Sequence, residues 1–362
     1  MKSVIVTNIP TPYRNPVWAL LPRGQFTVVF CACAEGNRRW QLAPPDCDHV
    51  FLRENTRALS DGYNFVHDNR DVWEVLQRLS PDVVVTTGLN PTHLYAILWA
   101  KLHAVRHIYM TDGTELSERT LGWKHRLLRR LIVRGSAAGV AASLSGRRLL
   151  ESYGLPADRI YLSRLCADNA RFAPPPFGTR PYDVMFCGQL HERKLPYFFV
   201  SVCGEILRRR GTCRALIVGD GPEREAVFSA LREAGIEPAW PGFVNPEELP
   251  GWYQQARILL FPTRLDAWGV IANEAMASGI PVITTPEAGC AGDLVRDGIN
   301  GRVLPADVAT WADACVDLLG DSVRWQALSD RALQNVQAFN FDDAAQGLQA
   351  ACEAAARPRR QR

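Results

Sequence analysis

Two carboxylates with seven residues between them stand in a stretch that otherwise has the composition of packed core. The segment LDAWGVIANEAMASGIPVITT (265–285) contains Asp266 and Glu274. The preceding RILLFPT predicts a strand, and GVIANEAMASG predicts a helix that Gly279 and Pro281 terminate. We therefore expect Asp266 in the loop at the carboxyl end of a strand, and Glu274 inside a helix among small apolar residues.

A carboxylate in such surroundings needs a partner, because burying an unpaired charge is costly. Two hydroxyl groups of a ligand would provide one by donating to both oxygens of Glu274. The alternative is that Glu274 faces solvent or pairs with an arginine. Gly269 permits close approach of the backbone, and the amides of a first helical turn favour phosphate oxygens. The pattern indicates a ligand with hydroxyls and phosphates.

The composition excludes several other classes of protein. With 362 residues and 47% hydrophobic content the chain can bury two cores, and a net charge of +3 gives no general argument for nucleic acid. The start MKSVIVTNIP lacks a signal-peptide pattern, and no apolar segment approaches the roughly 20 residues that cross a bilayer. Ten cysteines without a C-x-x-C pair are typical of buried thiols in a reducing compartment. We expect a cytoplasmic protein.

Short apolar runs alternate with helical patterns along the whole chain. The runs that predict strands are SVIVTN, FTVVFCAC, HVFL, DVVVTTG, HIYMTD, GVAAS, RIYLS, YDVMFCGQL, CRALIVGDG, RILLFPT and IPVITT. Helices are expected between them, among them segments that begin near 196, 222, 269 and 307. This alternation predicts an α/β protein with two Rossmann-like, doubly wound domains. In such sheets the loops at the carboxyl ends of strands hold ligands.

A proline-rich stretch interrupts the alternation. APPPFGTRP (173–181) excludes helix and central strand alike. We therefore predict an N-terminal domain over 1–173, a linker over 174–181 and a C-terminal domain over 182–340. Residues 341–362 are expected to form a helix that packs back on the N-terminal domain, followed by a basic tail.

The stretch FPTRLDAWGVIANEAMASGIPVITT resembles the nucleotide-sugar signature of the retaining glycosyltransferases of family four. VMFCGQLHERK, LIVGDGP and AGCAGDLVRDGINGRVLP are similar to other elements of that family and occur in its order. The resemblance covers nearly all of the second half and, more weakly, the first. It implies the GT-B fold, in which two Rossmann-like domains face each other across a cleft.

The resemblance also implies roles for individual residues. Glu274 would hold the ribose, and Asp266 would contact hydroxyls of the transferred sugar. Lys194, with Arg193, would stabilise the negative charge of the departing diphosphate. The other donor-binding positions are Gly188, Gly219, Val244 beside the base, and the main-chain amides of Trp268, Gly269 and Val270.

Two positions depart from the family pattern. Asp266 stands where the family usually has the longer glutamate, and Gln189 stands where an arginine is common. The family's retention is explained by front-face attack, with the donor's phosphate oxygen taking the acceptor proton. The implied enzyme is a hexosyltransferase that requires neither an enzymic nucleophile nor a metal or other cofactor.

The acceptor is expected on the N-terminal domain. TNIPTPYRNP follows the first strand, so Asn8, Thr11, Tyr13 and Arg14 are candidate acceptor-binding residues, or else its prolines merely fix a turn. Asp112 falls where many relatives have a histidine near the reaction centre. It would orient the acceptor hydroxyl, or alternatively cap the next element.

Residues 119–134 predict a basic amphipathic helix with Trp123, Leu127 and Leu131 on one stripe. Such a helix is typical of peripheral binding to the anionic inner face of the cell membrane. The alternative is that it packs its leucines on the sheet. The tail RPRRQR would assist such binding weakly. We discount the Asp46-Cys47-Asp48 triplet as a metal site, because short acidic triplets are common.

The leading hypothesis is transfer of a sugar from a nucleoside diphosphate to a carbohydrate or lipid-linked glycan, in bacterial surface-polysaccharide or glycoconjugate assembly. Expected partners are therefore a nucleotide sugar and a glycan acceptor, without nucleic acid. One alternative is a nucleotide-sugar epimerase or hydrolase of the same fold. Another is a catalytically degenerate relative that serves as a binding partner.

Overall fold

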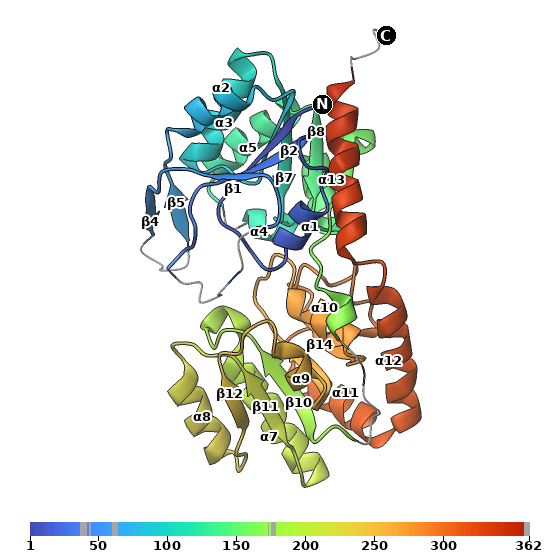
Figure 1. Cartoon of the computed structure of the whole chain (residues 1–362). Helices are drawn as coiled ribbons and strands as arrows, with labels where there is room; N and C mark the ends of the chain where they lie inside the picture. Colours follow the sequence, from blue (N-terminus) through green and yellow to red (C-terminus); the bar gives the residue numbers. More distant parts are fainter. Residues whose placement is uncertain are drawn as a thin grey trace. The chain divides into compact units, whose positions relative to one another are not determined.

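The chain forms two compact units in a computed structural model that describes residues 1–36, 42, 45–59, 64–119, 121–172, 174 and 179–357 (Figure 1). The first unit comprises Met1–Leu165 with Phe341–Arg362, and the second comprises Cys166–Asn340. The boundary thus precedes the expected linker. Residue 173, residues 175–178 of that linker and residues 358–362 of the tail lie outside the described part.

The first unit is built on a seven-stranded parallel sheet in the order β3-β2-β1-β6-β7-β8-β9. Its strands are short apolar runs, and most of their residues are buried, as a sheet covered on both faces requires. The bounds are β1 Ser3–Thr7, β2 Phe26–Phe30, β3 His49–Phe51, β6 Val83–Thr86, β7 Arg106–Thr111, β8 Ala138–Ala141 and β9 Ile160–Leu162.

Helices and one hairpin complete the first unit. The helices are α1 Asn15–Ala19, α2 Val72–Leu79, α3 Pro91–Leu102, α4 Glu115–Arg119, α5 Trp123–Gly135, α6 Leu144–Ser152, η1 Ala157–Arg159 and α13 Phe341–Ala356. The antiparallel hairpin pairs β4 Thr56–Ala58 with β5 Phe65–His67.

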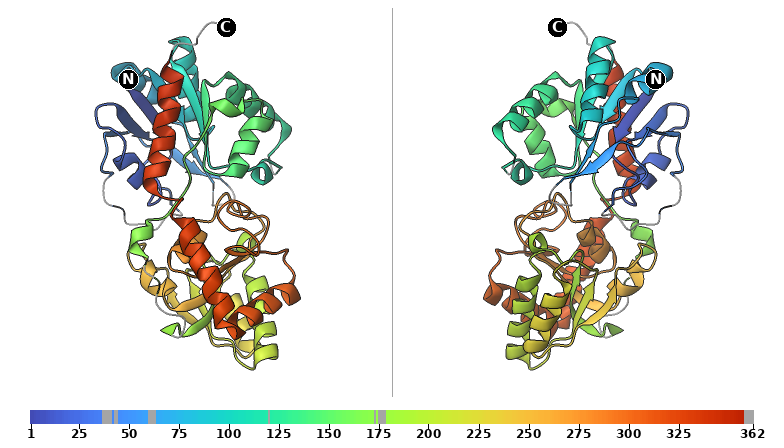
Figure 2. Two further views of the ribbon diagram at one scale, coloured as in Figure 1. Left: turned by 90° about the vertical axis from the view of Figure 1, so that its right-hand side faces the viewer. Right: turned by 90° about the vertical axis from the view of Figure 1, so that its left-hand side faces the viewer.

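The last helix of the chain, α13, belongs to the first unit and runs beside its sheet (Figure 2). Gly347 permits this packing, because a Cβ at that position would lie 1.8 Å from the carbonyl oxygen of Leu162. A larger residue there would force the helix away from β9.

The second unit contains a six-stranded parallel sheet in the order β12-β11-β10-β13-β14-β15. Its strands are β10 Tyr182–Cys187, β11 Ala215–Val218, β12 Ala239–Gly242, β13 Ala256–Phe261, β14 Val282–Thr284 and β15 Gly301–Val303. Its helices are η2 Asn169–Arg171, η4 Glu192–Lys194, α7 Pro196–Arg210, α8 Arg224–Glu233, α9 Leu249–Tyr253, α10 Val270–Ala277, α11 Val308–Gly320 and α12 Ser322–Val336.

Both sheets reverse their strand order beside the first strand of the unit. The reversal lies between β1 and β6 in the first unit and between β10 and β13 in the second. Open α/β sheets bind ligands outside the carboxyl ends of the strands at such a switch point. The loops after these four strands are therefore the places where a site is expected.

The predicted fold class of two Rossmann-like, doubly wound units is confirmed. The sequence patterns missed β12, β15 and the β4–β5 hairpin. These strands are only three or four residues long, and β12 reads AWPG, in which proline and glycine hide the strand signal. Among the described residues, no helix combines the length and the apolar character needed to span a membrane.

Candidate functional site

The loop after β10 is tied by its backbone to the loop after β13. It turns through the short helix η4 and then through Leu195, whose left-handed backbone has φ 51°. The carbonyl oxygen of Arg193 accepts hydrogen bonds from the Arg264 amide at 2.9 Å and from the Thr263 hydroxyl at 3.1 Å. Two loops from neighbouring strands at the switch point thus form one rigid platform.

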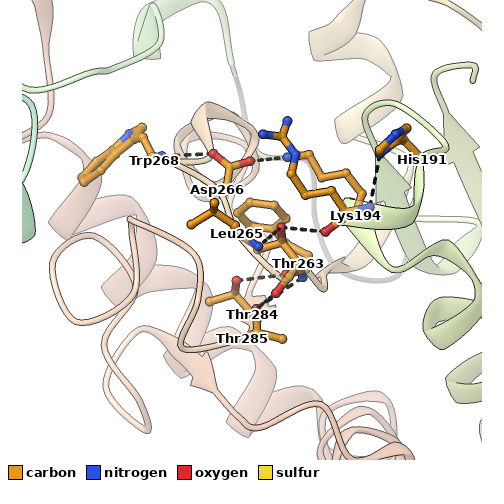
Figure 3. A network of polar contacts seen from close by, with 10 residues as sticks. His191, Lys194, Thr263, Leu265, Asp266, Trp268, Thr284 and Thr285 are labelled. Atoms are coloured by element: carbon orange, nitrogen blue, oxygen red, sulfur yellow. Dashed lines mark hydrogen bonds and ion pairs between the residues drawn. The ribbon is translucent and has the colours of Figure 1, made fainter. Parts of the chain in front are cut away.

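Buried threonines reinforce that platform from below. The Thr285 hydroxyl donates to the carbonyl oxygen of Thr263 at 2.7 Å, and the Leu265 amide donates to the Thr263 hydroxyl at 3.2 Å. Figure 3 shows these contacts beneath the charged groups. Both threonines are buried, so these hydrogen bonds are shielded from water and strengthen the loop.

Lys194 and Asp266 form an ion pair on this platform. The ammonium of Lys194 donates to Oδ2 of Asp266, and the Trp268 amide donates to Oδ1 at 3.0 Å (Figure 3). Burial opposes ionisation of the carboxyl, but attraction to Lys194, these two hydrogen bonds and the charge of Arg193 outweigh it. The pKa of Asp266 is therefore lowered, and the carboxylate remains charged.

The phenyl ring of Phe261, the last residue of β13, joins the ion pair to the start of α10. The Lys194 ammonium lies 5.0 Å from the ring centroid. Gly269, with φ 94°, rests on the same ring, where a Cβ would lie 2.2 Å from Cε1 of Phe261. A cation and the amide-rich end of a helix therefore share one small area, which is the arrangement that binds phosphate.

Glu274 is buried inside α10 with 3% of its surface exposed. The alternative that it faces solvent is therefore wrong. The hydroxyl of Tyr253, the last residue of α9, donates to Oε2 of Glu274 at 2.7 Å. Burial, followed by the effects of Cys187 and Glu274, raises the pKa of Tyr253 well above its ordinary value. The phenol consequently stays protonated and acts as a donor to the carboxylate.

Cys187, the last residue of β10, lies beside both charged groups. Burial and the charge of Glu274 raise the pKa of its thiol, Tyr253 and Lys194 lower it, and the net result is a pKa of about 12. Lys194 lies in the loop after β10, and Asp266 and Glu274 lie in the loop and helix after the neighbouring strand β13. The switch point of the second unit therefore brings together Lys194, Asp266 and Glu274.

Glycines pack the ends of β10 and β11 against one another. A Cβ on Gly219, which has φ 125°, would lie 2.0 Å from the carbonyl oxygen of Gly188. A Cβ on Gly188 would meet nothing within 4 Å, so that residue borders open space. Val244 follows β12, and its side chain is buried. These three predicted donor-binding positions lie at or just beyond the carboxyl edge of the sheet.

Trp268 has a different role from the one expected. Its amide, which we expected to face a ligand, donates to Asp266, and its carbonyl oxygen accepts from the Cys290 amide at 2.9 Å. Its indole is buried and donates to Oδ1 of Asn273 at 2.8 Å. Trp268 therefore supports Asp266 through the protein interior, while Gly269 and Val270 stay predicted ligand contacts.

The first unit has its own polar cluster at the carboxyl edge of its sheet. Arg14 is buried and donates to Oδ1 of Asp112 at 2.7 Å and to the carbonyl oxygen and hydroxyl of Ser163 at 3.0 and 3.1 Å. The side-chain amide of Asn90 donates to Oδ1 of Asn8 at 3.4 Å. The predicted residues Arg14, Asp112 and Asn8 thus follow strands β1 and β7 of one sheet edge.

The structure changes the interpretation of two of these residues. The guanidinium of Arg14 is engaged with Asp112 and Ser163 and so holds Asp112 in place, while acceptor binding by Arg14 stays a prediction. Thr114 and Ser117 exchange hydrogen bonds at the start of α4. They perform there the capping that was the alternative role for Asp112.

The remaining predicted acceptor residues lie in the turn before α1. The Thr11 amide donates to Oδ1 of Asn15 at 3.1 Å, and the Thr11 carbonyl accepts from the Asn15 amide at 3.0 Å. Tyr13 is half-buried in the same turn. These bonds stabilise the turn, as its prolines predicted, and leave an acceptor role for Thr11 and Tyr13 a prediction.

The acidic triplet lies apart from these sites. Asp46 pairs with Arg23, and Asp48 accepts from the Gly24 amide at 2.6 Å. Within the described part of the chain, no group of three or more histidine, cysteine, aspartate or glutamate side chains is placed to hold a metal ion.

Helix α5 presents an apolar stripe to solvent. Trp123, Leu127 and Leu131 are 66%, 49% and 63% exposed, whereas Val133 on the inner side is fully buried. The alternative that these leucines pack on the sheet is therefore wrong. Exposed cations flank the stripe: Lys124, Arg126, Arg130 and Arg134.

Sequence reasoning missed three residues that build the second unit's site, namely Tyr253, Phe261 and Cys187. Phe261 and Cys187 read as ordinary strand residues. Tyr253 stands 21 positions before its partner Glu274, in a helix of only five residues. The position of Cys187 and Phe261 at the carboxyl ends of adjacent strands was the one available signal.

Comparisons with known proteins agree with this architecture. The family "Glycosyl transferase 4-like domain" matches residues 11–163, and the family "Glycosyl transferases group 1" matches residues 181–321. The chain is 29% identical over 371 aligned positions to a D-inositol 3-phosphate glycosyltransferase of Nocardia farcinica, covering 95% of this chain and 78% of that protein. A shorter match, 28% identical over 44% of this chain and 42% of the other, is to an Escherichia coli protein provisionally named colanic acid biosynthesis glycosyltransferase WcaL.

Solved structures share the fold. HepE of Anabaena, in complex with UDP and glucose, has a TM-score of 0.76 at 14% identity, covering 98% of this chain and 99% of that one. Sucrose-phosphate synthase of Thermosynechococcus elongatus has a TM-score of 0.72 at 15% identity over 98% of each chain.

The two parallel-sheet units and their matches define the class of the protein, a glycosyltransferase with the GT-B fold. Within that class the chain belongs to the glycosyltransferases of family four, and the two family models match its two units in turn.

Proposed function

We propose that this glycosyltransferase moves a hexose from a nucleoside diphosphate sugar to a carbohydrate or lipid-linked glycan, with retention of configuration. The observation that carries the proposal is the Lys194–Asp266 ion pair beside the start of α10 at the switch point. It offers one cation to a diphosphate and one carboxylate to sugar hydroxyls, which are the two chemical parts of such a donor.

In this proposal the diphosphate of the donor lies against Lys194, the exposed side chain of Arg193 and the amides of Gly269 and Val270. Breaking the bond between the sugar's anomeric carbon and phosphate oxygen leaves negative charge on the diphosphate. Cations already in position stabilise that charge without reorganising, which lowers the barrier. Glu274 holds the ribose, and the open space beside Gly188 admits the donor.

The acceptor oxygen attacks the anomeric carbon from the face that the diphosphate leaves. The new glycosidic bond forms as the old one breaks, and the acceptor proton passes to the departing phosphate oxygen. No enzymic nucleophile is needed in this scheme. We propose that Lys194 and Arg193 perform the charge stabilisation for which other enzymes use a metal ion.

Asp112 is the candidate for orienting the acceptor hydroxyl, because its carboxylate is half exposed while Arg14 fixes its position. Two relatives support the acceptor class by their names, one acting on D-inositol 3-phosphate and one assigned to colanic acid biosynthesis. We therefore propose hydroxyl acceptors of carbohydrate type, in surface-polysaccharide or glycoconjugate assembly.

We also propose that α5 docks on an anionic membrane at the cytoplasmic face, which suits a lipid-linked acceptor. The exposed stripe of Trp123, Leu127 and Leu131 supports this role, since an apolar stripe flanked by cations matches the interface of an anionic bilayer. The double change Leu127→Glu with Leu131→Glu should abolish cosedimentation with phosphatidylglycerol vesicles. Leu102→Glu on α3 is the control, since Leu102 is at least as exposed as these two leucines; equal loss in both would contradict the proposal.

The function is tested by incubating the protein with UDP-, GDP- and ADP-hexoses, with and without carbohydrate acceptors such as inositol 3-phosphate. We expect nucleoside diphosphate release that depends on acceptor, persists with EDTA and gives a product with the donor's anomeric configuration by NMR. Release without any acceptor would indicate a hydrolase, and conversion of the donor sugar an epimerase. Failure of every nucleotide to bind would indicate a degenerate relative.

A further inference from the structure

A buried tyrosine stands behind the carboxylate that we assign to the ribose. Tyr253 is fully buried, and its hydroxyl donates to Oε2 of Glu274 at 2.7 Å. Glu274 itself is only 3% exposed, on a helix whose neighbouring residues are small and apolar. In such surroundings the direction of a carboxylate is set by the few polar groups that reach it.

Three separate elements meet at this hydroxyl. Tyr253 comes from α9, Glu274 from α10 and Cys187 from the end of β10, and the phenol interacts with both the thiol and the carboxylate. The aromatic ring is also held edge-on by Phe172, with centroids 5.8 Å apart. The hydroxyl is therefore a fixed donor whose place does not depend on a ligand.

We propose that Tyr253 is a positioning residue for nucleotide binding, which orients Glu274 so that its carboxylate meets the ribose hydroxyls. The proposal rests on the proposed function, because Glu274 must hold a ribose for its orientation to matter. Carboxylate oxygens accept hydrogen bonds along defined directions, so a rotated or displaced Glu274 would lose ribose contacts even though its charge remained.

The test compares Tyr253→Phe with the wild-type chain by calorimetry, using UDP, GDP and ADP as probes. Loss of the Tyr253 hydroxyl should lower the affinity for the nucleotide that binds about tenfold. A misdirected Glu274 would lose a hydrogen bond from a ribose hydroxyl, and about tenfold is the usual cost of losing a hydrogen bond to a charged group. Tyr153→Phe is the matched control, because Tyr153 donates in the same way to the buried carboxylate of Glu118, but in the first unit. It should leave nucleotide affinity unchanged while lowering stability similarly.

Deoxy analogues separate positioning from simple loss of structure. In the wild type, the 2′- or 3′-deoxy form of the same nucleotide should bind at least tenfold more weakly than the parent. In Tyr253→Phe the ratio of the affinities for the parent and deoxy nucleotides should shrink to about threefold or less, because Glu274 already makes poor hydrogen bonds with the ribose hydroxyls.

The outcomes distinguish the two proposals. If no nucleotide binds the wild type, the proposed function fails, and this inference fails with it. If the wild type binds but Tyr253→Phe binds equally well, or retains the full penalty for the deoxy analogues, Tyr253 does not position Glu274 and the proposed function stands.

Discussion

Each unit places a cation–aspartate pair at the carboxyl edge of its sheet, but the two pairs differ in which group is exposed. In the second unit Lys194 and Asp266 are each 16% exposed. In the first unit the side chain of Arg14 is only 9% exposed, whereas that of Asp112 is 47% exposed. In the second unit the cation and the acid are therefore equally accessible to a ligand. In the first unit only the acid, Asp112, is accessible.

This difference follows from the chemistry of the two cations. The guanidinium of Arg14 is planar and donates to three acceptors on Asp112 and Ser163, so it cannot turn to a ligand without leaving them. The ammonium of Lys194 has three rotatable donors on a flexible stem. We infer that Lys194 can exchange part of its contact with Asp266 for phosphate oxygens, whereas Arg14 serves to hold Asp112.

The largest effect is expected from Lys194→Ala. Turnover should fall about 10²- to 10³-fold, since a preorganised cation would be lost from the leaving group. Arg14→Ala should instead act chiefly on stability and on acceptor KM. Steady-state kinetics at saturating donor gives kcat and the acceptor KM of both variants, and unfolding in urea gives their stability. A kcat of Lys194→Ala within about tenfold of wild type would contradict the distinction between the two pairs.

The two acids of the second unit should separate binding from turnover. Glu274→Ala should weaken nucleotide binding about 10- to 100-fold, because hydrogen bonds to a carboxylate are lost. Asp266→Ala should reduce kcat more than nucleotide affinity, because it contacts the sugar rather than the nucleotide. Calorimetry with nucleoside diphosphate and steady-state kinetics test this, and equal, negligible effects of both changes would refute the assignment.

The Lys194–Asp266 pair should also be visible in the dependence of stability on pH. The native pKa of Asp266 lies below its ordinary value of 3.8, so its ionised form stabilises the native state above that pH. Asp266→Asn should cost about 2 kcal/mol near pH 7. The difference from wild type should shrink as the pH falls below about 4 and through the lowered native pKa. Urea unfolding between pH 7 and pH 3 checks this, and a constant difference would contradict it.

The smallest effect is expected from Arg14→Lys. A lysine keeps the charge but loses the planar fork, so Asp112 should be held less precisely and the acceptor KM should rise about tenfold. Nucleotide affinity should not change. Arg148→Lys is the matched control, since Arg148 pairs with Glu115 on the exposed surface of the same unit. If both substitutions behave alike, Arg14 has no positioning role.

The sequence predicted the second unit's site better than the first. Lys194, Asp266, Gly269 and Glu274 come from contiguous motifs in which one strand, one loop and one helix carry the pattern. In the first unit, the partners of Arg14 lie 98 and 149 positions away along the chain. No local spacing indicates such contacts, and the turn that contains Arg14 has no glycine to mark close approach.

By itself the sequence determined the alternation of strands and helices, and therefore two parallel sheets with ligand loops at their carboxyl edges, because periodicity and turn residues act locally. It also determined which residue types stand in those loops. Only the tertiary structure decided the partners: Lys194 with Asp266, Tyr253 with Glu274, Arg14 with Asp112, and Trp268 in the interior. Those contacts depend on how separate elements pack, and packing brings together residues whose distance along the chain carries no signal.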